Sequence, residues 1–200
     1  INHLSQFFSL SFTTISLALV AVNEVKFNKE VYANMIDKFN LYELAVQALK
    51  NNDKNAIMSI IKDIDMDVVD PSGETLLWKA VQRKAIDIVN IFLDAGANVN
   101  IPDKDGWTPL HIAVQNQDRN IVEILLRYNP EINAQNKYGN NPLWVAVFYA
   151  KGRRDIINLL LDAGADPYLE NYAGINAIQL AQTIANYDNV SIFKSRGFLV

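Results

Sequence analysis

Apolar residues recur at helical spacing along most of the chain, in pairs of short runs separated by turns. In one run Leu110, Ala113 and Val114 fall at positions i, i+3 and i+4, which places them on one face of a helix. In the next run, IVEILL at 121–126, the apolar residues form a broad stripe. Each pair of runs is therefore predicted to fold as a helix, a short turn and a second helix, followed by a loop.

The predicted helix pairs repeat at a fixed period. Gly73, Gly106 and Gly139 lie 33 residues apart, and Gly174 follows 35 residues after Gly139. The two added residues fall in FYAKGRRD, between the two apolar runs of the third unit. The glycines occupy similar frames, which read DPSGETLLWKAV, DKDGWTPLHIAV, NKYGNNPLWVAV and NYAGINAIQLAQ. A period of this length indicates a repeat architecture.

The motif Gly-x-Thr-Pro-Leu-His-x-Ala at 106–113, the 33-residue period and the DAGA endings of two units resemble ankyrin repeats. The resemblance implies an all-α fold: an α-solenoid of helix–turn–helix units with short β-hairpin-like loops, about four repeats and an N-terminal half-repeat cap. The expected units are an apolar N-terminal segment (1–23), a linker or start of the cap (24–40), a capping repeat (41–69), three repeats (70–102, 103–135 and 136–170, the last with the insertion) and a degenerate C-terminal repeat (171–200).

His111 is the residue of the motif that most resembles a catalytic group, because it follows Thr108 and Pro109. The resemblance implies instead that Thr and His of the motif bond to each other and to nearby backbone. Thr108 also suits a helix N-cap, and Pro109 suits a first helical turn. The spacing suggests no oriented partner and no nucleophile. We therefore predict a structural His111 and a protein that is not an enzyme.

The sequence contains none of the common motifs for phosphate binding, metal binding or a catalytic nucleophile. The glycines are spread at repeat spacing rather than clustered in a phosphate-binding loop, and no HExxH, nucleophile elbow or calcium-loop pattern occurs. We expect no cofactor and no metal site. The motif's His position carries Trp78 in one repeat and Trp144 in another. Two interpretations stay open: neighbouring repeats absorb these rings, or the rings enrich a binding surface.

The resemblance also implies a concave binding face, built from hairpin tips and inner helices. Aromatic residues fall at several of its formally exposed positions, as expected for a contact patch with anchor residues; partial packing on adjacent repeats is the alternative. The candidate protein-binding residues are Trp107, Tyr138, Tyr149, Phe148, Arg83, Lys104, Asn140 and Tyr172. The basic loop AKGRRD (150–155) either pairs with a carboxylate or phosphate of a partner or is simply solvated.

Composition narrows the range of partners. The formal net charge is −4, which argues against nucleic acid because a phosphate backbone needs a basic face. The chain has no cysteine, which excludes disulfides, thiolate catalysis and Cys-ligated zinc. Residues 4–23 carry no charge, and their densest part has the length of a signal-peptide core. An export signal or membrane anchor is expected there, with a buried or docked helix as the alternative.

Together these features predict a monomeric, non-enzymatic protein-binding module that contacts a membrane only if its N-terminal segment is an uncleaved anchor. An exported, periplasmic location is expected, or a cytoplasmic one if that segment is a packed helix. Such a chain resembles bacterial periplasmic ankyrin proteins. The specific hypothesis is an immunity protein that neutralises a secreted toxin, since an acidic pI of about 5.2 would suit a basic toxin surface. The alternatives are an accessory or assembly factor for a periplasmic enzyme or envelope complex, and a secreted effector acting on host proteins.

Overall fold

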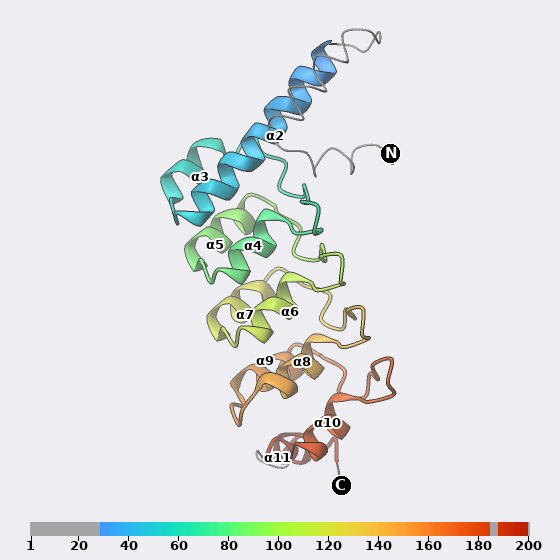
Figure 1. Cartoon of the computed structure of the whole chain (residues 1–200). Coiled ribbons are helices and arrows are strands. Elements are labelled where there is room, and N and C mark those ends of the chain that lie inside the picture. The colour runs from blue at the N-terminus through green and yellow to red at the C-terminus, as the bar shows by residue number, and fades with distance from the viewer. Residues whose placement is uncertain (1–28, 185–187, 200) are drawn as a thin grey trace.

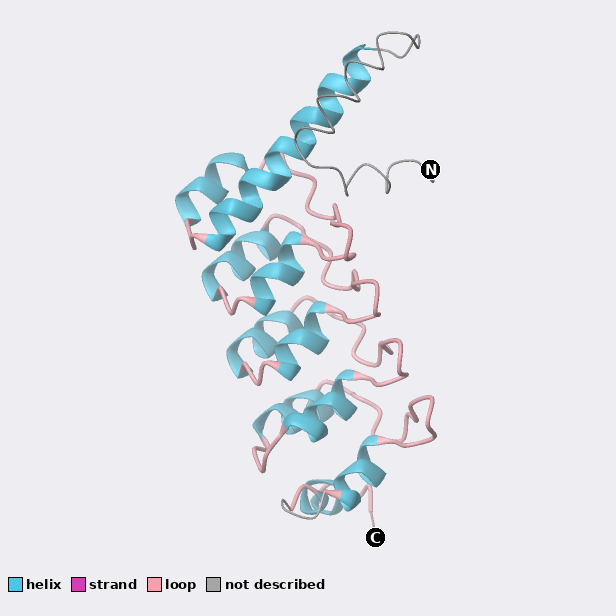
Figure 2. Cartoon of the chain, viewed as in Figure 1, coloured by secondary structure: helices cyan, strands magenta, loops and turns pink. Residues whose placement is uncertain are grey.

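The computed structural model describes residues 29–184 and 188–199, with side chains from Asn40 onward. The predicted N-terminal segment 1–23 lies outside these residues. The described part is built from helices and loops, without strands (Figure 2). Its ten helices are α2 (Lys29–Lys50), α3 (Lys54–Ile60), α4 (Leu76–Gln82), α5 (Ile86–Asp94), α6 (Pro109–Gln115), α7 (Arg119–Leu126), α8 (Pro142–Tyr149), α9 (Asp155–Asp162), α10 (Ala177–Thr183) and α11 (Val190–Ser195).

The helices form five pairs that stack into an elongated solenoid (Figure 1). Helices α4, α6, α8 and α10 contact one another in sequence and make an inner layer. Helices α3, α5, α7 and α9 contact one another in sequence and make an outer layer. Because each pair packs only on its neighbours, the structure is a repeat solenoid rather than a single closed core. The predicted all-α solenoid is confirmed.

The inner helices begin at the same kind of cap. Thr75, Thr108, Asn141 and Asn176 each have extended backbone and accept a hydrogen bond from the N–H three residues later. Such a cap satisfies one of the backbone donors that the first helical turn leaves unpaired. Helices of seven or eight residues are too short to be stable alone in water, so caps and packing must hold them.

Burial supplies the packing energy of the stack. Leu77, Leu110, Leu143 and Ile178 occupy equivalent positions in successive inner helices, and all four are buried. Full burial of an aliphatic side chain of this size contributes roughly 1.5–3 kcal/mol. The repeated apolar position in the sequence thus becomes a continuous column of core residues along the solenoid.

The loops between repeats share one hydrogen-bonding pattern. In the loop that begins at Asp103, the Asp103 carboxylate accepts from the backbone N–H groups of Asp105 and Trp107. The Gly106 N–H donates to the Asp103 carbonyl, and the Asp103 N–H donates to the Trp107 carbonyl. This explains why Asp or Asn stands three residues before each glycine of the period. The other loops repeat the pattern around Asp70, Asn136 and Asn171.

Successive loops are also joined to each other, along the side of the solenoid where they project (Figure 2). The N–H of Lys104 donates to Ser72, that of Lys137 to Asp105, and that of Tyr172 to Tyr138, each across a gap between repeats. The hairpin tips therefore form one connected row.

Helix α2 differs from the other helices in its length. It runs without interruption from Lys29 to Lys50, so the expected boundary between residues 40 and 41 falls inside it. Its C-terminal part packs on α3 and α4 as the first layer of the stack. Among the residues that the structure describes, no helix combines the length and apolar character needed to cross a membrane.

Candidate protein-binding surface

His111 lies in the interior, where it ties two repeats together. Its Nδ1 is 2.8 Å from the Thr108 hydroxyl, and its Nε2 is 3.0 Å from the backbone carbonyl of Asn140 in the next repeat. Burial lowers the pKa of His111 to about 4, although the bond to Asn140 acts in the opposite direction. A neutral, buried imidazole with both nitrogens occupied has the structural role that the motif implied.

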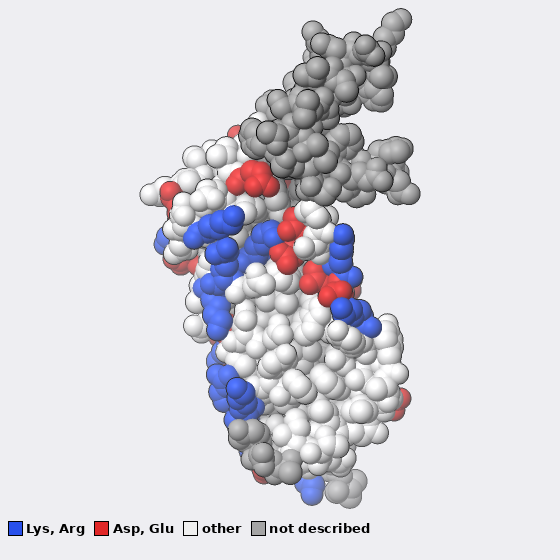
Figure 3. All heavy atoms as spheres, viewed as in Figure 1, with Lys and Arg blue, Asp and Glu red and all other residues white. Residues whose placement is uncertain are grey.

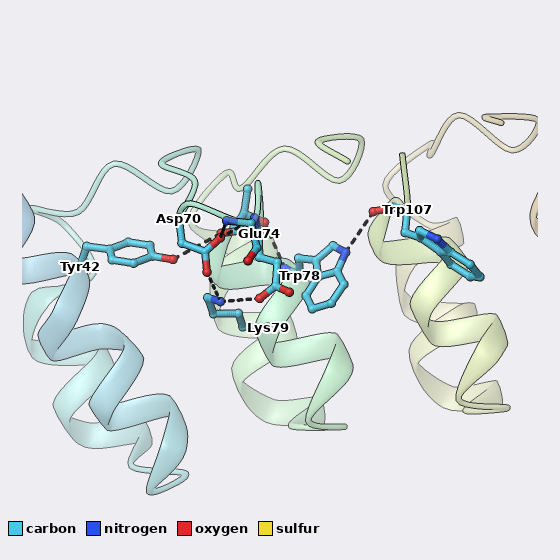
Figure 4. A network of polar contacts seen from close by, with 8 residues as sticks. Tyr42, Asp70, Glu74, Trp78, Lys79 and Trp107 are labelled. Carbon is cyan, nitrogen blue, oxygen red and sulfur yellow. Dashed lines mark hydrogen bonds and ion pairs between the residues drawn. The ribbon is translucent and has the colours of Figure 1, made fainter. Parts of the chain in front are cut away.

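Trp78 takes over this bridging role in the preceding repeat. Its Nε1 donates to the Trp107 carbonyl at 3.0 Å, and only 4% of the residue is exposed (Figure 4). Trp107 and Asn140 occupy equivalent repeat positions, so Trp78 and His111 serve the same acceptor site. For Trp78, the interpretation that neighbouring repeats absorb the ring is therefore correct.

Trp144, the third residue in this slot, behaves differently. Its Nε1 is buried without a hydrogen-bond partner among the described residues. Its ring is partly exposed and stacks on Phe148, with centroids 5.4 Å apart and ring planes at 11°. Trp144 therefore belongs to the surface as well as to the core.

We expect Trp78→Phe to lower the free energy of unfolding by about 1 kcal/mol more than Trp144→Phe, because only Trp78 loses a hydrogen bond. Both variants lose the same pyrrole portion of the ring, so each serves as the other's control. Urea unfolding followed by far-UV circular dichroism measures the difference. Equal losses, or a larger loss for Trp144→Phe, would show that the bond between Trp78 and Trp107 contributes little.

Two of the predicted binding residues lie together in an aromatic cluster that also contains Trp144. Phe148 is 53% exposed, stacks on Trp144 and meets the Tyr149 ring edge-on at 5.1 Å. The Tyr149 hydroxyl accepts a hydrogen bond from Gln115 of the preceding repeat at 3.1 Å. We call Trp144, Phe148 and Tyr149 the aromatic cluster. Its members pack on one another and so restrict the rotamers of the solvent-exposed Phe148 ring. Little side-chain entropy would then be lost when a partner covers that ring.

Tyr138 and Tyr172 lie on neighbouring hairpin tips. They are 54% and 76% exposed, and the bond from the Tyr172 N–H to the Tyr138 carbonyl joins their tips. Lys137 places its ammonium 5.1 Å from the centroid of the Tyr138 ring and pairs with Asp105. Arg83 and Lys104 are also exposed, as expected. These residues are accessible to a partner.

Asn140 is not accessible, and its prediction as an exposed contact residue is wrong. It is only 9% exposed, its side-chain oxygen accepts from Asn171, and its carbonyl accepts from His111. Trp107, at the equivalent position, is half-buried with its ring edge-on to His111 at 5.7 Å. Asn140 bonds to both adjoining repeats, whereas the Trp107 ring packs on His111 of its own repeat, so both residues lie deeper than the sequence register suggested.

The sequence interpretation omitted other residues of this region. Gln115 anchors Tyr149, and Ile175, which follows the exposed Tyr172 in its loop, is itself exposed. Trp144 was considered for a surface but not included among the candidates. The spacing of Trp144 and Phe148, four residues apart on one helix, is the signal that predicts their stacking.

The inner layer carries very little charge. Helices α6, α8 and α10 contain no Asp, Glu, Lys or Arg, whereas each of the outer helices α5, α7 and α9 contains at least two. Figure 3 accordingly shows a broad uncharged face, with a row of Lys and Arg along one edge and charges of both signs toward the opposite side. The surface around the aromatic cluster is therefore suited to apolar and neutral polar contacts.

The exception in the inner layer is Lys79 of α4, whose charge is neutralised locally. Its ammonium pairs with the carboxylates of Asp70 and Glu74 in its own hairpin (Figure 4). Partial burial of Asp70 opposes ionisation, but the hydrogen bond and charge of Lys79, together with the backbone N–H groups of Glu74 and Ser72, lower the pKa of that carboxyl. Tyr42 of α2 donates to the Glu74 carbonyl at 3.3 Å. This network joins the first helix pair to the next one and leaves no unpaired cation on α4.

Within the described residues, no three His, Asp or Glu side chains are grouped as metal ligands. The structure has an elongated uncharged face that carries aromatic side chains. A face of this kind is typical of repeat solenoids that bind partners. Models of the ankyrin-repeat family match the chain, as "Ankyrin repeats (3 copies)" over 43–136 and as "Ankyrin repeat" over 138–172. The chain belongs to the ankyrin-repeat family, whose repeats are protein–protein interaction modules and typically non-enzymatic. No curated protein matches the chain.

Proposed function

We propose that this protein is a non-enzymatic module that binds a protein partner on the face formed by α6, α8, α10 and the adjoining hairpin tips. The aromatic cluster carries the proposal, because a half-exposed Phe148 is braced by two further rings on an uncharged layer. Rigid aromatic side chains bury a large area with little loss of conformational entropy, which makes them frequent anchors of interfaces. The binding residues come from the scaffold itself, so little rearrangement is expected.

We expect Phe148→Ala to weaken partner binding by roughly tenfold to a hundredfold, the effect of losing a central anchor. The partner is first isolated by pull-down with tagged full-length protein, and the affinity is then measured by isothermal titration calorimetry. Tyr128→Ala is the matched control, because Tyr128 is an exposed aromatic that follows the outer helix α7. A Phe148→Ala protein that folds and binds with wild-type affinity would rule out this face as the interface.

For the identity of the partner, we propose a secreted toxin that this protein neutralises, in an exported, periplasmic setting. Support comes from the uncharged segment 4–23 and from the resemblance to periplasmic ankyrin proteins. The acidic net charge gives less support than the sequence suggested, because the candidate face is uncharged. An accessory factor of a periplasmic enzyme or envelope complex, and a secreted effector, are the alternatives.

Three observations separate these possibilities. Stoichiometric inhibition of a toxin encoded by a neighbouring gene supports the immunity hypothesis. Loss of a partner enzyme's activity on gene deletion supports the accessory factor, and release of the protein from the cell supports the effector. Fractionation of tagged full-length protein tests the location, and a purely cytosolic, uncleaved product would contradict export.

A further inference from the structure

A row of positive charges follows the turns that join inner to outer helices. The turn after α4 contributes Arg83 and Lys84, and the turn after α8 contributes Lys151, Arg153 and Arg154, all of them exposed. Figure 3 shows Lys and Arg along this edge of the uncharged face. We call these five residues the basic edge.

Most carboxylates near the basic edge already have partners. Asp118 caps α7 by accepting from the Ile121 N–H, and Asp188 pairs with Arg154 at 3.3 Å. Asp87 pairs with Lys54 at 2.6 Å, while Asp155 lies in the first turn of α9. Within the described residues, four cations of the edge have no carboxylate within 4.0 Å: Arg83, Lys84, Lys151 and Arg153. Their charges are therefore available to a partner.

The basic edge is continuous with the aromatic cluster. Arg83, Asn116 and Tyr149 occupy equivalent positions at the ends of successive inner helices, 33 residues apart. Lys84 donates to the Asn116 carbonyl at 3.1 Å, which joins the first two turns, and Lys151 lies two residues after Tyr149. A ligand seated on the aromatic cluster would thus have unpaired cations along one side.

We infer that the aromatic cluster and the basic edge form one bipartite interface for a protein segment that carries an apolar anchor next to Asp or Glu residues. The inference rests on the proposed function and adds the chemistry of the partner. Guanidinium groups bind carboxylates through two parallel hydrogen bonds, which orients the segment as well as attracting it. Charges at the rim of an interface mainly steer association and set specificity.

A protein segment fits these observations better than a nucleic acid does. The cations of the basic edge form a single row, whereas the hairpin tips carry charges of both signs, with carboxylates at Glu74, Asp103 and Asp105 beside Lys104 and Lys137. Those carboxylates would repel a phosphate backbone that spanned the face. The uncharged inner layer likewise offers no cation to phosphates that cross it.

The test selects phage-displayed random peptides on the full-length protein and measures the affinity of the most enriched synthetic peptide by calorimetry. We expect enriched peptides to combine an aromatic or aliphatic residue with Asp or Glu. Arg83→Gln and Arg153→Gln should each weaken binding about twofold to fivefold, as expected for exposed ion pairs. Arg127→Gln, which removes an exposed charge at the end of the outer helix α7, is the matched control and should change the affinity by less than about twofold.

Several results would overturn the bipartite interface. One is an enrichment without acidic residues, or no enrichment at all; another is an equal loss for Arg127→Gln, which would indicate a general charge effect. Peptides that depend on Phe148 but not on Arg83 or Arg153 would leave the proposed function intact and refute only this inference, whereas peptides that depend on none of the three would contradict both. Binding of a duplex oligonucleotide that is lost in the Arg83 and Arg153 variants would assign the edge to nucleic acid instead.

Discussion

Replacing Gly139 with Ala is expected to destabilise the protein by about 3 kcal/mol or more, through left-handed backbone strain plus a collision with the next repeat. Gly139 has φ of +77°, and a Cβ added there would lie 2.5 Å from the backbone nitrogen of Tyr172. The neighbouring atoms belong largely to backbone, which cannot rotate away. The methyl group would force apart the two loops that the bond from Tyr172 to Tyr138 joins.

Gly174→Ala is the matched control for this effect. Gly174 has the same kind of backbone, with φ of +71°, but the nearest atom to an added Cβ is the Glu170 carboxylate at 4.0 Å. We expect a loss of only about 1 kcal/mol, from the backbone alone. Urea unfolding by circular dichroism compares the two variants. Similar losses would mean that the close approach between loops is absent or readily relieved.

Acidification from about pH 7.5 to pH 5 is expected to lower the free energy of unfolding by about 2 kcal/mol through His111 alone. The pKa of this buried imidazole falls to about 4 in the folded state, whereas in the unfolded chain it keeps its ordinary value of 6.5. Between these values the unfolded state binds the proton and the folded state does not. The stabilisation is therefore complete above the unfolded pKa and is lost as the pH falls toward the folded one.

His111→Gln isolates this contribution, because other groups titrate equally in both proteins. Gln is a suitable replacement since Gln179 occupies the equivalent slot in the last repeat, where its side chain accepts from the Asn176 N–H. Denaturant unfolding at several pH values should give a shallower pH dependence for the variant. Parallel curves for the two proteins would contradict a neutral, buried His111.

Most of the repeat fold was predictable from the sequence, because its signals are local. The glycine spacing and the N-cap at Thr108 were predicted and are confirmed. Asp or Asn three residues before each glycine, and Thr or Asn before the other inner helices, are local signals of the same kind that the structure reveals. The accessibility of Asn140 was not predictable in this way, because its burial depends on His111 and Asn171 in adjoining repeats. The environment of Lys79 was not predictable either. Its charge is tolerated in the inner layer because Asp70 and Glu74 of the preceding hairpin pair with it.

The candidate surface was predictable in part. Aromatic residues at positions that the repeat register predicts to be exposed correctly indicated that Phe148, Tyr138 and Tyr172 are accessible. Which rings pack together, and which cations stay unpaired, depends on distances between repeats that the period alone does not specify. The cluster and the basic edge therefore emerge only from the fold.

Trp78, His111 and Trp144 occupy the same position in three successive repeats, but they do not all have the same role. Two copies use a ring N–H to tie one repeat to the next. In the third copy the N–H has no partner among the residues that the structure describes, and the ring instead stacks on Phe148, the most exposed residue of the aromatic cluster. Because Trp78 and His111 keep the repeats joined, the third copy of this position can take part in the proposed interface without loss of the framework.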